Sequence, residues 1–199
     1  RDVLDAEEQP VNPAAEPLAD RVGEYLDDVE RVVAESIERL GGLDVCVANA
    51  GWYPSDDVPV WDLDLDRWRT VLDRNLTIAF LTARAFLGGM LDQGWGRIVN
   101  VTSAAALHPP GPLNSAYGTA KAALNQMTRH LAAEIAGSGV TANVIHPGDV
   151  KTEMWADIKQ RVAGTGAAGE NYSSWVAWVE ETGGDPPEKA VDLVLRLTS

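Results

Sequence analysis

A tyrosine, a lysine and a serine stand at spacings that suit proton transfer. Tyr117 and Lys121 are four residues apart, and Ser103 lies fourteen positions before Tyr117. On a helix, positions i and i+4 are neighbours, so the phenol and the ammonium can reach one cleft. A neighbouring positive charge favours the phenolate and lowers a tyrosine pKa that is ordinarily near 10. The set predicts a general acid and base, although a Tyr-x-x-x-Lys pair alone also arises by chance.

Asn75 is a candidate for a different reason, because it is a polar residue on an apolar helical stripe. Its neighbours on that stripe are Leu72, Leu76 and Ala79. The pattern predicts a buried Asn75 side chain, and a buried amide needs hydrogen-bond partners. A structural hydrogen bond to a neighbouring helix would satisfy it as well as a functional role would.

The segments around these residues alternate between helix and strand patterns. Apolar residues recur at helical spacing at 28–40, 68–87 and 117–136. Short apolar runs typical of buried strands lie at 43–48, 97–102 and 140–145. Residues 1–27 contain three prolines and are predicted to be an irregular entry. Long helices between short apolar strands favour parallel pairing, so we predict one α/β domain over 1–199, a doubly wound parallel sheet in three layers, α/β/α.

The candidate residues gather at one edge of the predicted sheet. The tripeptide Asn-Ala-Gly at 49–51 follows the first strand, Ser103 follows the second, and Pro-Gly at 147–148 follows the third. Ligands of parallel α/β sheets bind at the carboxyl ends of the strands. The pattern therefore predicts a small-molecule site at this edge.

Composition and charge restrict the class of function. A chain of 199 residues with 45% hydrophobic and 23% charged residues fits one domain with a substantial core. The net charge of -14 argues against nucleic-acid or membrane partners, which need a basic surface. Cys46 is the single cysteine, and its apolar neighbours predict a buried, inert thiol. Without a signal-peptide pattern or a long apolar stretch, the predicted location is the cytoplasm.

Five motifs occur in a characteristic order: Asn-Ala-Gly at 49–51, Arg-Asn-Leu around Asn75, a strand ending in Ser103, Tyr117-x-x-x-Lys121, and Pro147-Gly148 followed by Thr152. Together they resemble the short-chain dehydrogenase/reductase family over nearly all of residues 20–198. The resemblance implies a Rossmann-like fold. It also implies an NAD(P)-dependent oxidoreductase that interconverts a secondary alcohol and a ketone by hydride transfer.

The resemblance gives each member of the catalytic set a role. Tyr117 would be the general acid in carbonyl reduction and the base in alcohol oxidation. Lys121 would hold the nicotinamide ribose and lower the Tyr117 pKa, and Ser103 would donate to the substrate oxygen. Asn75 would interrupt its helix and bind a water that leads to Lys121. Ser103 also has a structural alternative, a strand-end serine that caps a turn.

The same resemblance implies a set of cofactor contacts. The residues are Asp20, Asn49, Ala50, Gly51, Tyr117, Lys121, Pro147, Gly148, Val150 and Thr152. The turn at 49–51 would lie against adenosine, with Gly51 allowing close backbone approach. The segment 147–152 would meet the nicotinamide and phosphates. Asp20 stands about one strand, turn and helix before Asn49, where the family often has an aspartate that contacts adenine.

Two parts of the family pattern are absent from the sequence. No segment before Asn49 matches the Thr-Gly-x-x-x-Gly-x-Gly loop, and no strand pattern follows a predicted last helix at 189–197. We therefore expect a sheet that is incomplete at both ends, either because the sequence is part of a longer protein or because the protein lacks that loop. The cofactor would be NAD or NADP, and Arg1 and Asp2 lie near the position that selects between them. We favour NAD.

Residues 154–185 are predicted to form a lid over the substrate, because aromatic side chains on glycine hinges suit a mobile cover. Its aromatic residues are Trp155, Tyr172, Trp175 and Trp178. Trp52 and Tyr53, just after the turn at 49–51, would add to the same wall. We expect Ser103, Trp52 and Trp155 to contact a moderately large, apolar or ring-bearing alcohol or ketone. The alternative is that the aromatic residues serve packing or subunit contacts.

No metal site is predicted, because His108 and His146 lack a third ligand at a suitable spacing. Two other classes of function stay open, an inactive binding or scaffold protein and a cofactor-independent lyase on the same fold. The resemblance also implies a homo-oligomer, a dimer or a homotetramer, in which helices at 68–87 and 120–135 pack against a second subunit.

Overall fold

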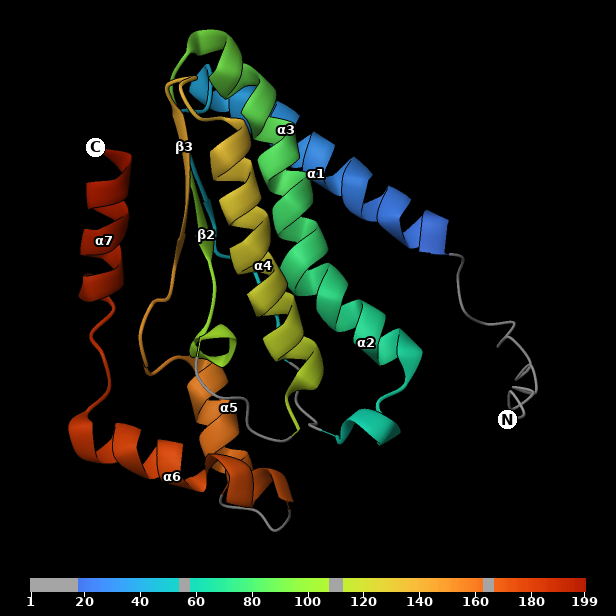
Figure 1. The fold of residues 1–199 in the computed structure, drawn as a ribbon, viewed down its shortest axis with the longest axis vertical. Helices are drawn as coiled ribbons and strands as arrows, with labels where there is room; N and C mark the ends of the chain where they lie inside the picture. Colours follow the sequence, from blue (N-terminus) through green and yellow to red (C-terminus); the bar gives the residue numbers. More distant parts are fainter. Residues whose placement is uncertain (1–17, 54–57, 108–112, 163–166) are drawn as a thin grey trace, which may run out of the picture.

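The structure, a computed structural model, describes residues 18–53, 58–107, 113–162 and 167–199 (Figure 1). Strands and long helices alternate along most of this part of the chain. In chain order the elements are α1 (Leu18–Leu40), β1 (Val45–Ala48), η1 (Val60–Asp62), α2 (Leu65–Leu72), η2 (Asp73–Thr77), α3 (Ile78–Gln93), β2 (Gly96–Val101), η3 (Ala104–Ala106), α4 (Ser115–Glu134), β3 (Val140–Ile145), α5 (Glu153–Val162), α6 (Ala167–Thr182) and α7 (Glu188–Thr198).

The described strands form one parallel sheet in the order β1, β2, β3. Val45 lies opposite Arg97 in the first pair, and Gly96 lies opposite Val140 in the second. In the central strand, Val99 is fully buried, as is typical of a parallel strand covered on both faces. The predicted α/β fold with a parallel sheet is confirmed.

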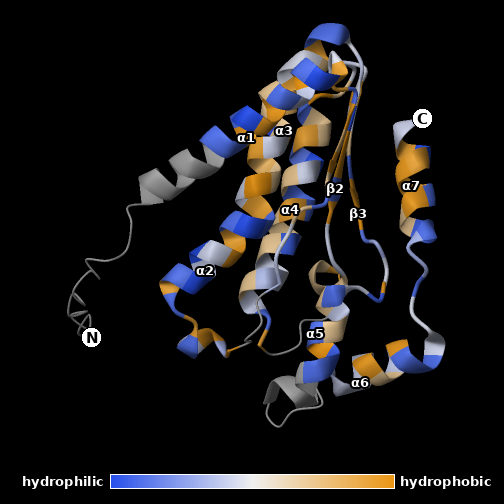
Figure 2. Cartoon of the chain, turned by 180° about the vertical axis from the view of Figure 1, so that it is seen from behind, coloured by the Kyte–Doolittle hydropathy of each residue, from blue (hydrophilic) through white to orange (hydrophobic). Residues whose placement is uncertain are grey.

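Helices cover both faces of this sheet (Figure 1). α3 and α4 pack against one face, α1 packs on α3, and α7 lies along the other face beside β2. The main core lies between the sheet and the first of these layers, and it includes Cys46, Ala83, Met90, Ile98, Ile135, Val140 and Ala142. Figure 2 shows the hydrophobic residues that run along α3 and the strands. Burial raises the pKa of the Cys46 thiol to about 11, which agrees with the predicted inert thiol.

The first helix begins earlier than the sequence pattern predicts. An irregular entry is expected over 1–27, but α1 is helical from Leu18. Pro17 is the last proline before this helix, and proline is tolerated where a helix starts because that N–H has no partner in the helix. Leu18 and Val22 then extend the apolar period of 28–40 toward the N-terminus. Residues 1–17 lie outside the described residues.

The long helix predicted at 68–87 is present but divided into α2 and α3. They are joined by the π-helical turn η2, in which the Ile78 N–H donates to the Asp73 carbonyl. Such turns insert one extra residue and are frequent at functional sites. Asn75 lies in the middle of this turn, so the helix interruption implied by the family resemblance is confirmed.

The segment predicted as a lid forms two helices, α5 and α6, which pack against each other below the carboxyl ends of the strands in Figure 1. The helix predicted at 189–197 is α7.

Candidate active site

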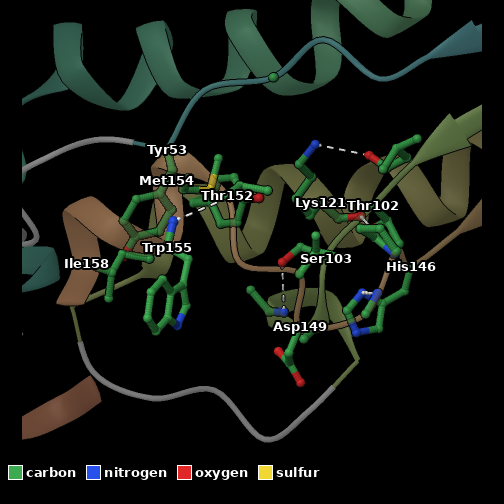
Figure 3. Close-up of a pocket in the computed structure, with 18 of the residues that line it drawn as sticks. Tyr53, Thr102, Ser103, Lys121, His146, Asp149, Thr152, Met154, Trp155 and Ile158 are labelled. Carbon is green, nitrogen blue, oxygen red and sulfur yellow. Dashed lines mark hydrogen bonds between the residues drawn. The ribbon is translucent and has the colours of Figure 1, made fainter. Parts of the chain in front are cut away.

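A cavity of about 810 Å³ opens at the carboxyl ends of β1, β2 and β3 (Figure 3). Its walls come from the loops after the three strands, from α4, and from α5 and α6. The described lining residues are Asn49, Gly51, Tyr53, Val101, Thr102, Ser103, Ala104, Ala105, Asn114, Tyr117, Lys121, His146, Pro147, Gly148, Asp149, Val150, Thr152, Glu153, Met154, Trp155, Ile158, Tyr172 and Trp175. The site predicted at this edge of the sheet is therefore a real cavity, and it contains the predicted tyrosine, lysine and serine.

Tyr117 and Lys121 lie one turn apart on α4 and face the cavity together. They are only 8% and 5% exposed. The Lys121 Nζ donates to the Val101 carbonyl at 3.1 Å and lies 5.7 Å from the centroid of the Tyr117 ring. Burial penalises the charged amine and lowers the Lys121 pKa to about 8.

Ser103 joins this pair from the end of β2. Its side chain makes a hydrogen bond with Tyr117, and its Oγ also accepts from the Ala105 N–H at 3.2 Å. The turn-capping alternative and the catalytic placement thus hold at the same time. The adjacent hydroxyl is used elsewhere, because the Thr102 Oγ1 donates to the Lys121 carbonyl at 3.1 Å. Ser103 is therefore the serine that reaches the tyrosine.

The Tyr117 pKa differs from the prediction. A value lowered by Lys121 is expected from the spacing, but burial raises the Tyr117 pKa, and only the hydrogen bond from Ser103 opposes the rise. The reason is that removing a phenolate from water costs more than the serine bond recovers, while the Lys121 Nζ points to a backbone carbonyl. In this structure Tyr117 carries its proton at neutral pH.

Asn75 is 1% exposed and makes three hydrogen bonds with backbone groups. Its Nδ2 donates to the carbonyls of Trp52 at 2.7 Å and Val71 at 2.9 Å, and its Oδ1 accepts from the Trp52 N–H at 3.1 Å. The structural alternative of a bond between helices is wrong, because the partners are a loop and the helix's own preceding turn. Asn75 fastens the loop after β1 to the π turn, while its role in a water relay stays a prediction.

Gly51 lies close to both Asn75 and Lys121. A Cβ at this position would lie 3.0 Å from the Asn75 Oδ1 and 3.2 Å from the Lys121 Nζ. These contacts are tighter than side chains normally make, so a side chain at position 51 would crowd both groups, while the approach of this backbone to adenosine stays a prediction. Asn49 and Gly51 line the cavity, whereas Ala50 does not.

The turn after β3 supplies the opposite wall. All four of its predicted residues, Pro147, Gly148, Val150 and Thr152, line the cavity. Gly148 has a φ of +89°, and a Cβ there would lie 2.7 Å from the Asp185 carboxylate. The turn is closed by Asp185, whose Oδ2 accepts from the Asp149 N–H at 3.0 Å.

Asp20 belongs to the first helix of the described chain. It lies in the first turn of α1, not after a strand, because the helix starts at Leu18. The predicted contact of Asp20 with adenine stays a prediction.

The aromatic wall differs by two residues from the expectation, because neither Trp52 nor Trp178 is among the described lining residues. Trp155, Tyr172 and Trp175 line the cavity together with Tyr53. Trp52 instead packs beside Val71 and Tyr117 in a small core, and Arg74 lies 4.8 Å over its ring. Trp52 is not among the described lining residues of the cavity, and its predicted substrate contact stays a prediction.

Asp149 is a lining residue that the sequence reasoning missed. Its Oδ1 accepts from the Trp175 Nε1 at 2.9 Å, which ties α6 to the turn after β3. The signal was present in the sequence, since Asp149 follows a glycine directly after a predicted strand.

His146 lines the cavity, and its Nδ1 accepts from the Gly148 N–H at 3.3 Å. His108 lies outside the described residues. Within the described ranges, no group of three or more His, Cys, Asp or Glu side chains could hold a metal ion. Nor is any helix in these ranges long and apolar enough to cross a bilayer.

A parallel α/β sheet with a cavity at the carboxyl ends of its strands is typical of dinucleotide-binding folds. The chain belongs to the short chain dehydrogenase family, whose model matches residues 12–163.

Three relatives illustrate the similarity. The 3-oxoacyl-[acyl-carrier-protein] reductase of Synechocystis sp. is 37% identical over 133 residues, which cover 66% of this chain and 52% of that protein. The acetoacetyl-CoA reductase of Cupriavidus necator is 40% identical over 124 residues, covering 62% and 49%. The crystal structure of NAD+-bound xylitol dehydrogenase is 30% identical with a TM-score of 0.63, covering 71% and 55%. The chain thus spans about half the length of the curated relatives it matches.

Proposed function

We propose that the protein is an NAD(P)-dependent oxidoreductase that interconverts a secondary alcohol and a ketone. The observation that carries the proposal is that Ser103 and the buried Tyr117 and Lys121 line one cavity at the carboxyl ends of the strands. Membership of the short chain dehydrogenase family supports the same reaction class.

Tyr117 is the general acid in the direction of carbonyl reduction. Burial raises its pKa, so the phenol keeps its proton at neutral pH and has it ready for the substrate oxygen. Ser103 shares a hydrogen bond with Tyr117, and its hydroxyl fixes and polarises that oxygen. In the oxidative direction Tyr117 acts as the phenolate, which accepts the alcohol proton, while Ser103 donates a hydrogen bond to the substrate oxygen.

The residues of the cavity fit a nicotinamide dinucleotide. Gly51 leaves room where a Cβ would crowd Asn75 and Lys121, so a flat ligand group can approach the backbone. The Lys121 ammonium is a donor for ribose hydroxyls, and the turn at 147–152 forms the facing wall. When bound, the nicotinamide supplies or accepts the hydride. We favour NAD over NADP, in keeping with the NAD+-bound xylitol dehydrogenase.

The substrate is an uncharged, mainly apolar alcohol or ketone. Tyr53, Trp155, Tyr172 and Trp175 give the cavity an aromatic wall. Among the described lining residues Lys121 is the only Lys or Arg, and the cofactor engages it, so no cation remains for a substrate carboxylate or phosphate. Asp149 and Glu153 on the same wall add repulsion for anions.

The test is a turnover assay on the purified full-length protein. NADH or NADPH is mixed with uncharged and anionic ketones of similar size, and nicotinamide absorbance is followed. Turnover of an uncharged ketone is expected, and Tyr117→Phe should reduce kcat by about 1,000-fold, as for the loss of a general acid. A Tyr117→Phe protein with unchanged turnover would show that the mechanism is wrong. An absence of nicotinamide-dependent turnover would favour the scaffold or lyase alternatives.

We also propose a cytoplasmic homo-oligomer, with the dimer and the homotetramer as the expected forms. Phe80 on α3 is 47% exposed, which leaves an aromatic ring on the helix layer for a second subunit to cover. Light scattering after gel filtration measures the assembly, and a monomer would contradict the proposal.

A further inference from the structure

Tyr53 lies between the catalytic tyrosine and the lid. It belongs to the loop after β1, two residues beyond Gly51. Its ring meets the Tyr117 ring edge to face, with the centroids 5.1 Å apart and the planes at 80°. Aromatic pairs of this geometry are favourable beyond their buried area. The Tyr53 ring therefore restrains the Tyr117 ring from the side that faces the cavity.

The other end of the Tyr53 side chain reaches α6. The Tyr53 hydroxyl donates to the Tyr172 hydroxyl at 2.8 Å, a contact between residues 119 positions apart in the chain. Tyr172 and Tyr53 both line the cavity (Figure 3 labels Tyr53 beside Met154 and Trp155). Tyr172 on the lid thus contacts Tyr53, and Tyr53 contacts Tyr117. A substrate that touches the lid can therefore affect Tyr117 through the Tyr53 side chain.

The lid has a second attachment that does not involve Tyr117. The Trp175 Nε1 donates to the Asp149 Oδ1 at 2.9 Å, and the two ends of the segment meet where the Asp185 N–H donates to the Asp149 carbonyl at 3.1 Å. These bonds hold the base of the lid to the turn after β3. The bond between Tyr53 and Tyr172 couples the lid to the catalytic side of the cavity.

We propose that Tyr53 is a positioning residue that links lid closure to the orientation of Tyr117: its ring orients the catalytic phenol, and its hydroxyl holds Tyr172 when the lid is closed. The inference rests on the proposed function, since it assigns Tyr53 a part in that reaction. The hydroxyl and the ring of Tyr53 have two separate effects, which experiments can distinguish. The hydroxyl affects substrate retention, and the ring affects the chemical step.

Steady-state kinetics of the full-length protein with a ketone that it reduces separates these effects. Tyr53→Phe keeps the ring and removes the bond, so KM should rise about fivefold, the effect of one hydrogen bond of about 1 kcal/mol, while kcat stays within about twofold. Tyr172→Phe should give the same change, and the double variant should be no worse than either single variant. Tyr53→Leu removes the ring and should lower kcat about tenfold, less than the roughly 100-fold cost of a 1 Å misplacement.

A measurement without substrate covers the case in which the Leu variant is merely unstable. Limited proteolysis of α5 and α6 should be faster in Tyr53→Phe and in Tyr172→Phe, by about fivefold in each and not more in the double variant, if opening of the lid limits cleavage. Tyr25→Phe is the matched control, because Tyr25 belongs to α1, which packs on α3 rather than on the cavity. It should leave kinetics and proteolysis unchanged.

Two outcomes would overturn the inference and leave the proposed function intact. One is a Tyr53→Phe protein with unchanged KM and unchanged proteolysis. The other is additive effects of the two phenylalanine substitutions, since residues that share one bond cannot lose it twice. Failure of the proposed function would instead appear as an absence of nicotinamide-dependent turnover in the wild-type protein.

Discussion

Two regions surround the cavity: a floor formed by the strand ends, the π turn η2 and α4, and a lid formed by α5 and α6. The side chains of these two regions make different kinds of hydrogen bond. On the floor, Asn75, Thr102 and Lys121 are all buried, and each side chain donates to a backbone carbonyl. On the lid, Tyr172 and Trp175 are only partly buried and reach other side chains instead. Backbone partners cannot be changed by substitution, whereas side-chain partners can. The proposed proton-transfer groups thus lie in the region held by bonds to the backbone, and the proposed substrate contacts lie in the region held by bonds between side chains.

The largest expected effect concerns Lys121, because burial in the floor of the cavity destabilises its charged form. Burial lowers the Lys121 pKa to about 8, while an unfolded lysine titrates near 10.4. Between these pH values the unfolded chain binds more protons than the folded one, so the unfolding free energy rises with pH. Relative to Lys121→Met, the wild-type unfolding free energy should increase by on the order of 3 kcal/mol from about pH 8 to about pH 10.4.

Urea unfolding across this pH range measures the difference, in which titrations common to both proteins cancel. Lys189→Met is the control, because Lys189 is exposed on α7 and lies outside the cavity lining. A difference between wild type and Lys121→Met that stays flat with pH would mean that Lys121 is not desolvated on the floor.

The next effect concerns Asn75, which fastens the loop after β1 to the π turn. Asn75→Ala leaves three backbone groups without their partners at a site that is 1% exposed, so the unfolding free energy should fall by about 2 kcal/mol. Asn125→Ala on α4 is the matched control, since the Asn125 Oδ1 has no partner among the described residues. Denaturant unfolding compares the two. An Asn75 loss no larger than the Asn125 loss would contradict the structural role.

The sequence predicts the floor better than the lid, and the difference has a physical cause. The strand at 140–145 and the pairing of Tyr117 with Lys121 follow from regular periods of the backbone, and both appear in the structure as predicted. Which of Trp52 and Tyr53 faces the cavity depends on the dihedral angles of an irregular loop, and no period encodes them. The Tyr117 pKa was predicted in the wrong direction for a related reason, because spacing indicates neighbours but not burial.

The smallest expected effect concerns Trp175 on α6, one of the two helices of the lid. Trp175→Phe keeps an aromatic ring but removes the bond to Asp149 and part of the indole surface, and the lost bond alone should weaken the attachment of α6 by about 1 kcal/mol. Because the bond is local, amide hydrogen exchange in α6 should quicken about fivefold while exchange in β2 stays unchanged. Trp178→Phe is the control on the same helix, since Trp178 is 47% exposed. Equal acceleration in β2 would mean that the lid and the floor unfold as one unit. The two regions would then differ in their hydrogen-bond partners but not in their local stability.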